Sequence, residues 1–252
     1  MDLTDPPAAT GPDAVPGAHR LLDIPGVRNA RDVGGFTTTQ GARVRTGLLY
    51  RTGWLAELTP EGALAVAKLG VRTVLDLRDP AEIERWPDRL HGLEPATAHH
   101  PLLPQDGEDH YGKPLAEAYR LITDTAADTL PALLGRLTEA GALPALLHCA
   151  VGRDRTGIAV AVLLGALGVA DEDIVDDYLL SNLGLGLLDG VPQEYVDANG
   201  VVRVTEVVGP ALITGVLAVL RERYGSPAAF LVEHGLGEQG LARLRELFLD
   251  PA

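Results

Sequence analysis

A short apolar run at residues 145–148 is followed at once by the loop sequence of residues 149–156, and then by the almost entirely apolar residues 157–167. The first run fits a buried strand, and the last fits a helix that is buried on most of its sides. A strand, a loop and a helix in this order form the repeating unit of α/β domains. Because ligands of open parallel sheets bind where the strands end, the sequence predicts a binding loop at Cys149.

The rest of the chain alternates between strand patterns and helix patterns. Thr59, Pro60 and Glu61 indicate a helix start, since threonine caps helices, proline fits the first helical position and an acid suits the first turn. The alternation predicts an α/β fold with a mainly parallel central sheet flanked by helices. The predicted strands lie at residues 44–50, 71–77, 97–103 and 145–148, and the predicted helices at residues 60–70, 157–167, 171–182, 205–224, 227–235 and 239–249.

Two long segments, residues 101–114 and residues 182–200, have no periodic pattern. Such segments often form lids or substrate loops in α/β domains, so we expect an irregular or helical lid, although plain surface loops fit the same pattern. Residues 1–20 are rich in Pro, Gly, Ala and Asp, which predicts a disordered leader. Residues 21–252 are then expected to form a single domain.

Composition excludes several classes of function. The net charge of −14 disfavours binding to nucleic acid and to anionic membranes, and the longest apolar run is too short to span a bilayer. The single cysteine allows no intramolecular disulfide, which favours a reducing compartment. The first residues lack the pattern of a signal peptide. We therefore predict a cytoplasmic protein without stable membrane insertion, and the sequence predicts no oligomeric state.

The loop sequence brings together the groups that phosphate chemistry needs. At the N-terminus of a helix the local field favours the thiolate of Cys149, which is then a nucleophile. Gly152 permits a backbone conformation that a side chain would obstruct. The planar fork of Arg155 can bind two phosphate oxygens, while Thr156 and His148 are expected to support the thiolate and the loop. The predicted phosphate-binding residues are Ala150, Val151, Gly152, Arg153, Asp154 and Arg155.

These residues match the signature of the protein tyrosine phosphatase superfamily, a Cys and an Arg separated by five residues and followed by Ser or Thr. The fuller pattern, His-Cys-x-x-Gly-x-Asp-Arg-Thr-Gly, resembles the bacterial atypical tyrosine/lipid phosphatases of the mycobacterial PtpB type. The resemblance covers roughly residues 21–250. Other segments that resemble motifs of this family are residues 29–35, 49–53, 76–78 and 177–182.

The resemblance implies a phosphomonoesterase with a protein-tyrosine-phosphatase-like fold. Cys149 would form a phosphocysteine intermediate, Arg155 would hold the phosphate, and neither a metal nor another cofactor would take part. The implied substrates are phosphotyrosine or phosphoinositides, and a small phosphorylated metabolite is an alternative. Arg153 stands where the related enzymes usually have a lysine, which keeps the charge but changes its geometry.

Three aspartates are candidates for the general acid. The resemblance favours Asp154, inside the loop, over Asp88 and Asp76. Asp88 ends a Trp-Pro-Asp sequence like the acid loop of eukaryotic tyrosine phosphatases, but it lies further from Cys149 than that loop does. A structural pairing of Asp154 with an arginine is the competing interpretation.

The sequence also suggests residues that support the site and functions that compete with phosphatase activity. Arg31, Asp32 and Arg51 are expected to line the pocket, with structural ion pairing as an equally good interpretation. The histidines do not form a metal-binding pattern. An inactive phosphate-binding module is the alternative from another class. A rhodanese or arsenate-reductase type of thiol enzyme fits less well, since it would need a different loop or further cysteines.

Overall fold

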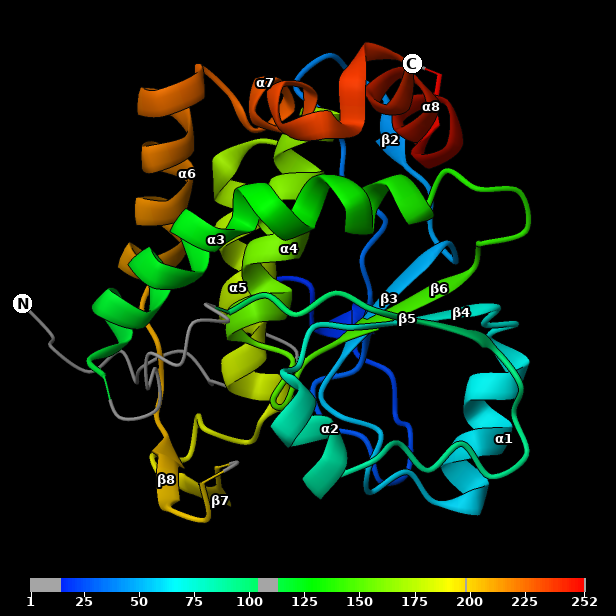
Figure 1. The fold of residues 1–252 in the computed structure, drawn as a ribbon, viewed down its shortest axis with the longest axis vertical. Coiled ribbons are helices and arrows are strands. Elements are labelled where there is room, and N and C mark those ends of the chain that lie inside the picture. Colours follow the sequence, from blue (N-terminus) through cyan, green and yellow to red (C-terminus); the bar gives the residue numbers. More distant parts are fainter. Residues whose placement is uncertain (1–14, 104–112, 198, 252) are drawn as a thin grey trace, which may run out of the picture.

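The computed structural model describes residues 15–103, 113–197 and 199–251. At its centre lies a five-stranded sheet with the order β1-β3-β6-β4-β5 (Figure 1). The strands β3, β6, β4 and β5 run parallel, and only the edge strand β1 is antiparallel. The bounds of the strands are β1 Arg31–Asp32, β3 Leu49–Thr52, β4 Thr73–Asp76, β5 Ala96–His99 and β6 Ala145–His148.

The inner strands β3, β6 and β4 of the sheet are buried on both faces, whereas the edge strand β5 is largely exposed. Successive side chains of a strand point to opposite faces, and Leu146 and Leu147 of β6 accordingly belong to different core clusters. The cluster around Leu146 packs against α1, while the larger cluster around Leu147 contains residues of α3 to α8. The helices and helical turns are η2 Ala18–Arg20, α1 Pro60–Lys68, α2 Pro80–Arg85, α3 Leu115–Arg136, α4 Asp154–Leu167, α5 Asp171–Gly184, α6 Ala211–Tyr224, α7 Pro227–Leu231, η3 Val232–Leu236 and α8 Gly237–Phe248.

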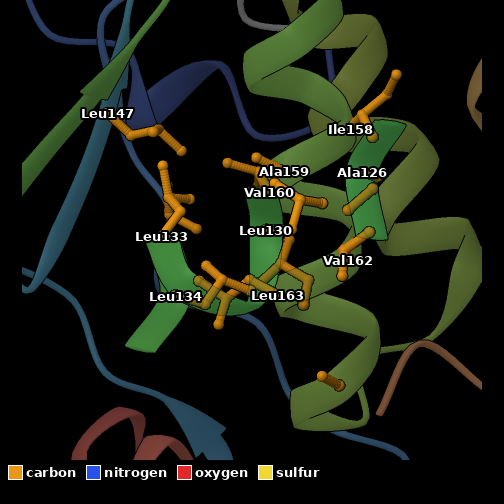
Figure 2. Packing of buried hydrophobic residues seen from close by; sticks show 14 of the residues in the cluster. Ala126, Leu130, Leu133, Leu134, Leu147, Ile158, Ala159, Val160, Val162 and Leu163 are labelled. Atoms are coloured by element: carbon orange, nitrogen blue, oxygen red, sulfur yellow. The ribbon is translucent and has the colours of Figure 1, made fainter. Parts of the chain in front are cut away.

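The helix α4 lies in the middle of the larger cluster. Its apolar side chains pack against those of α3 and against Leu147, as Figure 2 shows for Leu130 and Leu163. From Thr156 to Leu164 every residue of α4 is buried, which explains the apolar character of its sequence. At about 25 cal/mol per Å² of apolar area removed from water, this packing fixes α4, and with it the loop before the helix, in place.

Two small antiparallel sheets lie outside the central sheet. The strand β2 (Arg43–Val44) pairs with β9 (Leu249–Asp250), and β7 (Gln193–Val196) pairs with β8 (Val202–Thr205) in a hairpin. No helix within the described ranges is both long and apolar enough to cross a membrane.

The fold class agrees with the sequence prediction, but several elements differ. The strand predicted at residues 44–50 is divided between β2 and β3, because Gly47 has a positive φ of 76° between them. The helix predicted at residues 205–224 begins only at α6, because Val202–Thr205 pairs with β7. Pro80 opens α2, and the long helix α3 is absent from the prediction. The segment at residues 182–200, where an irregular or helical lid is expected, holds the end of α5 and the strand β7 of a hairpin. Of the other such segment, residues 101–114, residues 104–112 lie outside the described part of the chain.

The N-terminal boundary also differs from the predicted leader of residues 1–20. Residues 1–14 lie outside the described part of the chain. Arg20 ends the short helix η2 and is buried, with Nη1 2.7 Å from Oδ1 of Asp177. Arg20 therefore belongs to the folded domain.

Candidate active site

The loop between β6 and α4 carries Cys149, which is buried, at the end of the central strand. Gly152 has a φ of +68°, and a Cβ at this position would lie 2.2 Å from the carbonyl oxygen of Thr52. Both the backbone conformation and the close approach to β3 therefore require glycine. The hydroxyl of Thr156 is buried and has no hydrogen-bond partner among the described residues.

The carbonyl groups of the loop accept hydrogen bonds from the surrounding scaffold. Asn29 Nδ2 donates to the carbonyl of Gly152 at 2.9 Å and to that of Val151 at 3.3 Å. Arg51 Nη2 donates to the carbonyl of Gly152 at 2.7 Å and to that of Arg153 at 3.4 Å. These two side chains hold the outer side of the loop.

The backbone amide of Trp54 holds the carbonyl of Ala150 in the same way, at 2.9 Å. Because a trans peptide is planar, the carbonyl of one residue points away from the N–H of the next. The carbonyls of residues 150–153 face the scaffold, so the N–H groups of residues 151–154 face the interior of the loop. Converging N–H groups at a helix N-terminus bind anions, which makes the loop an anion cradle.

A buried charge cluster supports this arrangement. Asp177 of α5 accepts from Arg20, from Arg31 Nε at 3.2 Å and from Arg51 Nη1 at 2.6 Å. Burial raises the pKa of Asp177, but the three guanidinium groups outweigh it and hold the pKa far below its usual range. Burial and the neighbouring Arg51 lower the pKa of Arg31 to about 9.

The prediction that Arg31, Asp32 and Arg51 line the pocket is therefore wrong. Arg31 and Arg51 are fully buried behind the loop. The carboxylate of Asp32 accepts from the backbone amides of Gly34 at 2.7 Å and Gly47 at 2.6 Å, and thereby fixes two turns. The competing interpretation, structural ion pairing, describes Arg31 and Arg51, whereas Asp32 has a structural role through backbone amides.

Arg155 is held by a carboxylate that the sequence prediction does not include. Its Nη1 and Nη2 donate to separate oxygens of Glu82, at 2.5 and 2.8 Å. Glu82 also accepts from the backbone amide of Asp79 at 3.0 Å, as part of a capping box that opens α2. Burial raises the pKa of Glu82, but Arg155, the backbone amide of Asp79 and Arg78 together outweigh it and lower the pKa, so this group is a carboxylate at neutral pH. Glu82 fixes the plane of the guanidinium.

Asp154, in the first turn of α4, lies among hydrogen-bond donors. Its Oδ1 accepts from Arg153 Nε at 3.0 Å and from the hydroxyl of Tyr119 at 2.7 Å, while Oδ2 is 3.4 Å from Arg153 Nη2. Burial raises the pKa of Asp154, but Arg153 and Tyr119 outweigh it, so the net pKa lies below its usual value. Without substrate Asp154 is therefore ionised at neutral pH.

The other two candidate acids are engaged elsewhere. Arg78 Nη2 lies 2.7 Å from Oδ2 of Asp76 and 2.8 Å from Oδ1 of Asp88. Nε2 of the buried His148 lies 3.3 Å from Oδ2 of Asp88 and 3.8 Å from Oδ2 of Asp76. The side chains of Asp76, Asp88 and His148 lie close enough together to hold a metal ion, but the guanidinium of Arg78 already supplies a positive charge between the two carboxylates. His148 Nδ1 lies 3.3 Å from the carbonyl of Cys149.

Two cavities open beside the loop. The first, of about 270 Å³, is bordered by Ala150 and Val151 and by the aromatic side chains of Trp54, Trp86 and Tyr195. The two indole rings lie 5.2 Å apart. The second, of about 240 Å³, carries more cationic groups. Its charged lining residues are Lys113, Arg153, Asp154, Arg155, Arg203 and Glu206.

The hairpin β7–β8 contributes side chains to the lining of both cavities. Tyr195 and Thr205 line both of them. Arg153 Nη1 donates to the carbonyl of Glu206 at 2.7 Å, which attaches the segment after the hairpin to the loop. The hairpin therefore takes the position in which the sequence prediction expects a lid.

Sequence reasoning misses several of these residues. The spacing of Asp79 and Glu82 is a recognisable capping box, but it signals only a helix start. Tyr119 gives no signal because the helix α3 that carries it is not predicted. Asn29 and Asp177 lie in segments that resemble family motifs, yet their hydrogen bonds to the loop and to the arginines join parts of the chain far apart in sequence.

A family model and two named relatives match this chain. A family model described as "Tyrosine phosphatase family" matches residues 22–250. The provisionally named tyrosine-protein phosphatase H16_A0669 of Cupriavidus necator is 34% identical in an alignment of 186 positions that covers 70% of this chain and 68% of that protein. The triple specificity protein phosphatase PtpB of Mycobacterium tuberculosis is 27% identical in an alignment of 283 positions, gaps included, that covers 91% of this chain and 99% of that protein.

Proposed function

We propose, from the premise that this chain belongs to the tyrosine phosphatase family, that it hydrolyses phosphate monoesters through a phosphocysteine on Cys149. One observation carries this proposal. The scaffold holds the carbonyls of residues 150–153 outward, so that the loop amides form an anion cradle at the nucleophile. The buried Arg155, fixed by Glu82, lies in the same loop.

In the first step the thiolate of Cys149 attacks phosphorus in line with the leaving oxygen. An S–P bond forms, the P–O bond breaks, and the leaving oxygen takes a proton from an acid. The loop amides and Arg155 stabilise the charge on the other phosphate oxygens. In the second step water attacks phosphorus, the S–P bond breaks, and the sulfur leaves as a thiolate. Thr156 would donate its hydroxyl hydrogen to that sulfur.

We assign the acid to Asp154, which lies directly before Arg155 and lines the same cavity. It is ionised in the free protein, but a phosphate dianion in the cradle adds negative charge beside it and raises its pKa. The same carboxylate then accepts the proton of the attacking water. Asp76 and Asp88 fit the role less well, since Arg78 engages both.

The first cavity supports an aryl phosphate, such as phosphotyrosine, as substrate. Trp54, Trp86 and Tyr195 offer faces for an aromatic ring next to Ala150 and Val151 of the loop. Stacked or edge-to-face aromatic pairs add about 0.5–1.5 kcal/mol beyond their burial. PtpB of M. tuberculosis is named as a protein phosphatase, which agrees with such a substrate.

The second cavity supports a polyphosphorylated substrate, such as a phosphoinositide head group, as an alternative. Lys113, Arg153 and Arg203 line it next to Arg155, and arginine forks suit additional phosphate groups. A small phosphorylated metabolite would use the cradle alone. A cytoplasmic location of the enzyme is part of the proposal and is supported by the single cysteine.

A substrate panel tests the proposal. Hydrolysis of a phosphotyrosine peptide, a phosphoserine peptide, an inositol polyphosphate and a small alkyl phosphate is measured with the wild-type protein and with Cys149→Ser. We expect the highest kcat/KM on the phosphotyrosine peptide and no turnover by Cys149→Ser. Trp54→Ala should raise KM for the aryl substrate alone. Absence of turnover on every substrate would support an inactive phosphate-binding module instead.

A further inference from the structure

The hydroxyl of Tyr119 in α3 lies 2.7 Å from Oδ1 of Asp154 and 2.6 Å from the hydroxyl of Tyr178 in α5. The three groups come from three different helices, of which α3 and α5 each pack against α4, the helix of Asp154. Both tyrosines are buried, and their rings meet edge to face with centroids 6.2 Å apart. This chain of hydroxyls ends on the carboxylate that the proposed mechanism uses as an acid.

The direction of these hydrogen bonds follows from the charges. Burial and the charge of Asp154 hold the pKa of Tyr119 well above its usual value, so its hydroxyl keeps its proton. A carboxylate can only accept, so Tyr119 donates to Asp154. The hydroxyl of Tyr119 then accepts from Tyr178, whose pKa is likewise raised by burial and by Asp154.

The two oxygens of Asp154 are consequently not equivalent. Oδ1 accepts from both Tyr119 and Arg153, whereas the one contact of Oδ2 among the described residues is the long 3.4 Å contact with Arg153 Nη2. A proton that arrives on this carboxyl is better placed on Oδ2, because Oδ1 is saturated with donors. The side chain is also fixed in rotation, with Oδ1 toward α3.

We propose that Tyr119 is a positioning residue that orients the Asp154 carboxyl so that Oδ2 carries the catalytic proton. The inference rests on the proposed role of Asp154 as general acid and names the group that directs it. Tyr178 is separated from Asp154 by one more hydrogen bond and acts by orienting the hydroxyl of Tyr119.

The pH dependence of the reaction gives the proposal a specific signature. A hydrogen bond donated to a carboxylate favours its charged form and lowers its pKa. Tyr119→Phe removes this donor, so the pKa of Asp154 should rise and the acid should stay protonated to higher pH. The charged and titratable groups that face Asp154 or its cavity in the remaining structure are Lys113, Arg153, Arg155, Tyr178, Tyr195, Arg203 and Glu206.

The test compares kcat at saturating concentrations of two aryl phosphates, one with a poor and one with a good leaving group. For Tyr119→Phe we expect the basic limb of the kcat profile to move to higher pH by roughly one to two units with the poor leaving group. The maximum of that profile should fall about tenfold. The good leaving group needs little protonation, so its rate should change by less than about twofold.

Two further variants, Thr123→Val and Asp154→Asn, distinguish a positioning role of Tyr119 from a merely structural role and from a wrong assignment of the acid. Thr123→Val removes the buried hydroxyl that donates to the carbonyl of Tyr119 at 2.7 Å on the same helix, without a contact to Asp154, and it should leave both profiles in place. A uniform loss on both substrates with an unmoved basic limb in Tyr119→Phe would overturn the inference. If Asp154→Asn itself shows no dependence on the leaving group, the proposed acid is wrong; if only Tyr119→Phe shows none, only this inference fails.

Discussion

Asp177 is the only carboxylate in contact with the three buried guanidinium groups of Arg20, Arg31 and Arg51 within the described residues. In Asp177→Asn one oxygen can still accept from Arg20 and Arg31, as Oδ1 does now. The new amide group would then face Arg51 Nη1, donor against donor. Arg51 also donates to the loop carbonyls, so the substitution disturbs the stability of the domain and the shape of the cradle together.

The loss of stability expected for Asp177→Asn follows from the burial of its ion pairs. Removing one partner of a buried ion pair costs about 3–5 kcal/mol, because the remaining charge is left in a low-dielectric interior. With an m value near 3 kcal/mol/M, typical of the upper range in urea, the unfolding midpoint should fall by about 1–2 M. Circular dichroism during urea titration measures this midpoint at neutral pH.

Asp176→Asn is the matched control. Asp176 is the neighbour of Asp177 on α5 and makes no ion pair within the described part of the chain. Asp176 is partly exposed, and its substitution should change stability by no more than about 0.5 kcal/mol, as is usual away from buried ion pairs and the core. Equal midpoints for the two variants would refute the conclusion that the Asp177 cluster stabilises the loop scaffold.

Further predictions concern the loop itself. Asn29→Ala should leave the fold intact but weaken the binding of vanadate, a phosphate mimic, about tenfold, because the carbonyl of Val151 loses its side-chain donor and that of Gly152 loses one of two donors; calorimetry measures this, and unchanged affinity would count against the cradle. Glu82→Gln should lower kcat/KM by about one to two orders of magnitude while keeping the capping role, with an unchanged kcat/KM as the contrary result. Because the pKa of Glu82 is lower in the folded protein than in the unfolded chain, ionised Glu82 stabilises the fold at pH values above the unfolded pKa. This stabilisation should be lost as the pH falls through the folded pKa, so the urea midpoint of Glu82→Gln should depend less on acid pH than that of wild type. Peroxide should inactivate the enzyme, and added thiol should restore it after mild treatment, since Cys149 is the only cysteine; loss of activity that thiol never reverses would show a different target.

The parts of the fold that follow local rules are readable from the sequence. The strand β6 has the predicted bounds, and Thr59 caps α1 by accepting from the amide of Gly62 at 3.1 Å. The buried helix α4 follows from its apolar residues alone. These signals depend only on neighbouring residues, which is why a sequence can carry them.

Features that depend on distant contacts are not readable in this way. The helix α3 contains Pro131 and a mixture of apolar and acidic residues, and it is stabilised mainly by packing against α4, α6 and η3. Arg51 looks like a candidate for phosphate binding until the structure places Asp177 against it, 126 positions further along the chain. The contact of Tyr119 with Asp154 also depends on the position of α3.

The most direct test of the account is the covalent intermediate. Enzyme mixed with a radiolabelled aryl phosphate is quenched in acid within one turnover and analysed by peptide mapping. If Cys149 is the nucleophile, one labelled phosphoryl group per chain is expected on the peptide that contains Cys149, and no label in Cys149→Ser. Turnover by the wild type without a label on that peptide, or label retained in Cys149→Ser, would contradict the assignment of Cys149 as the nucleophile.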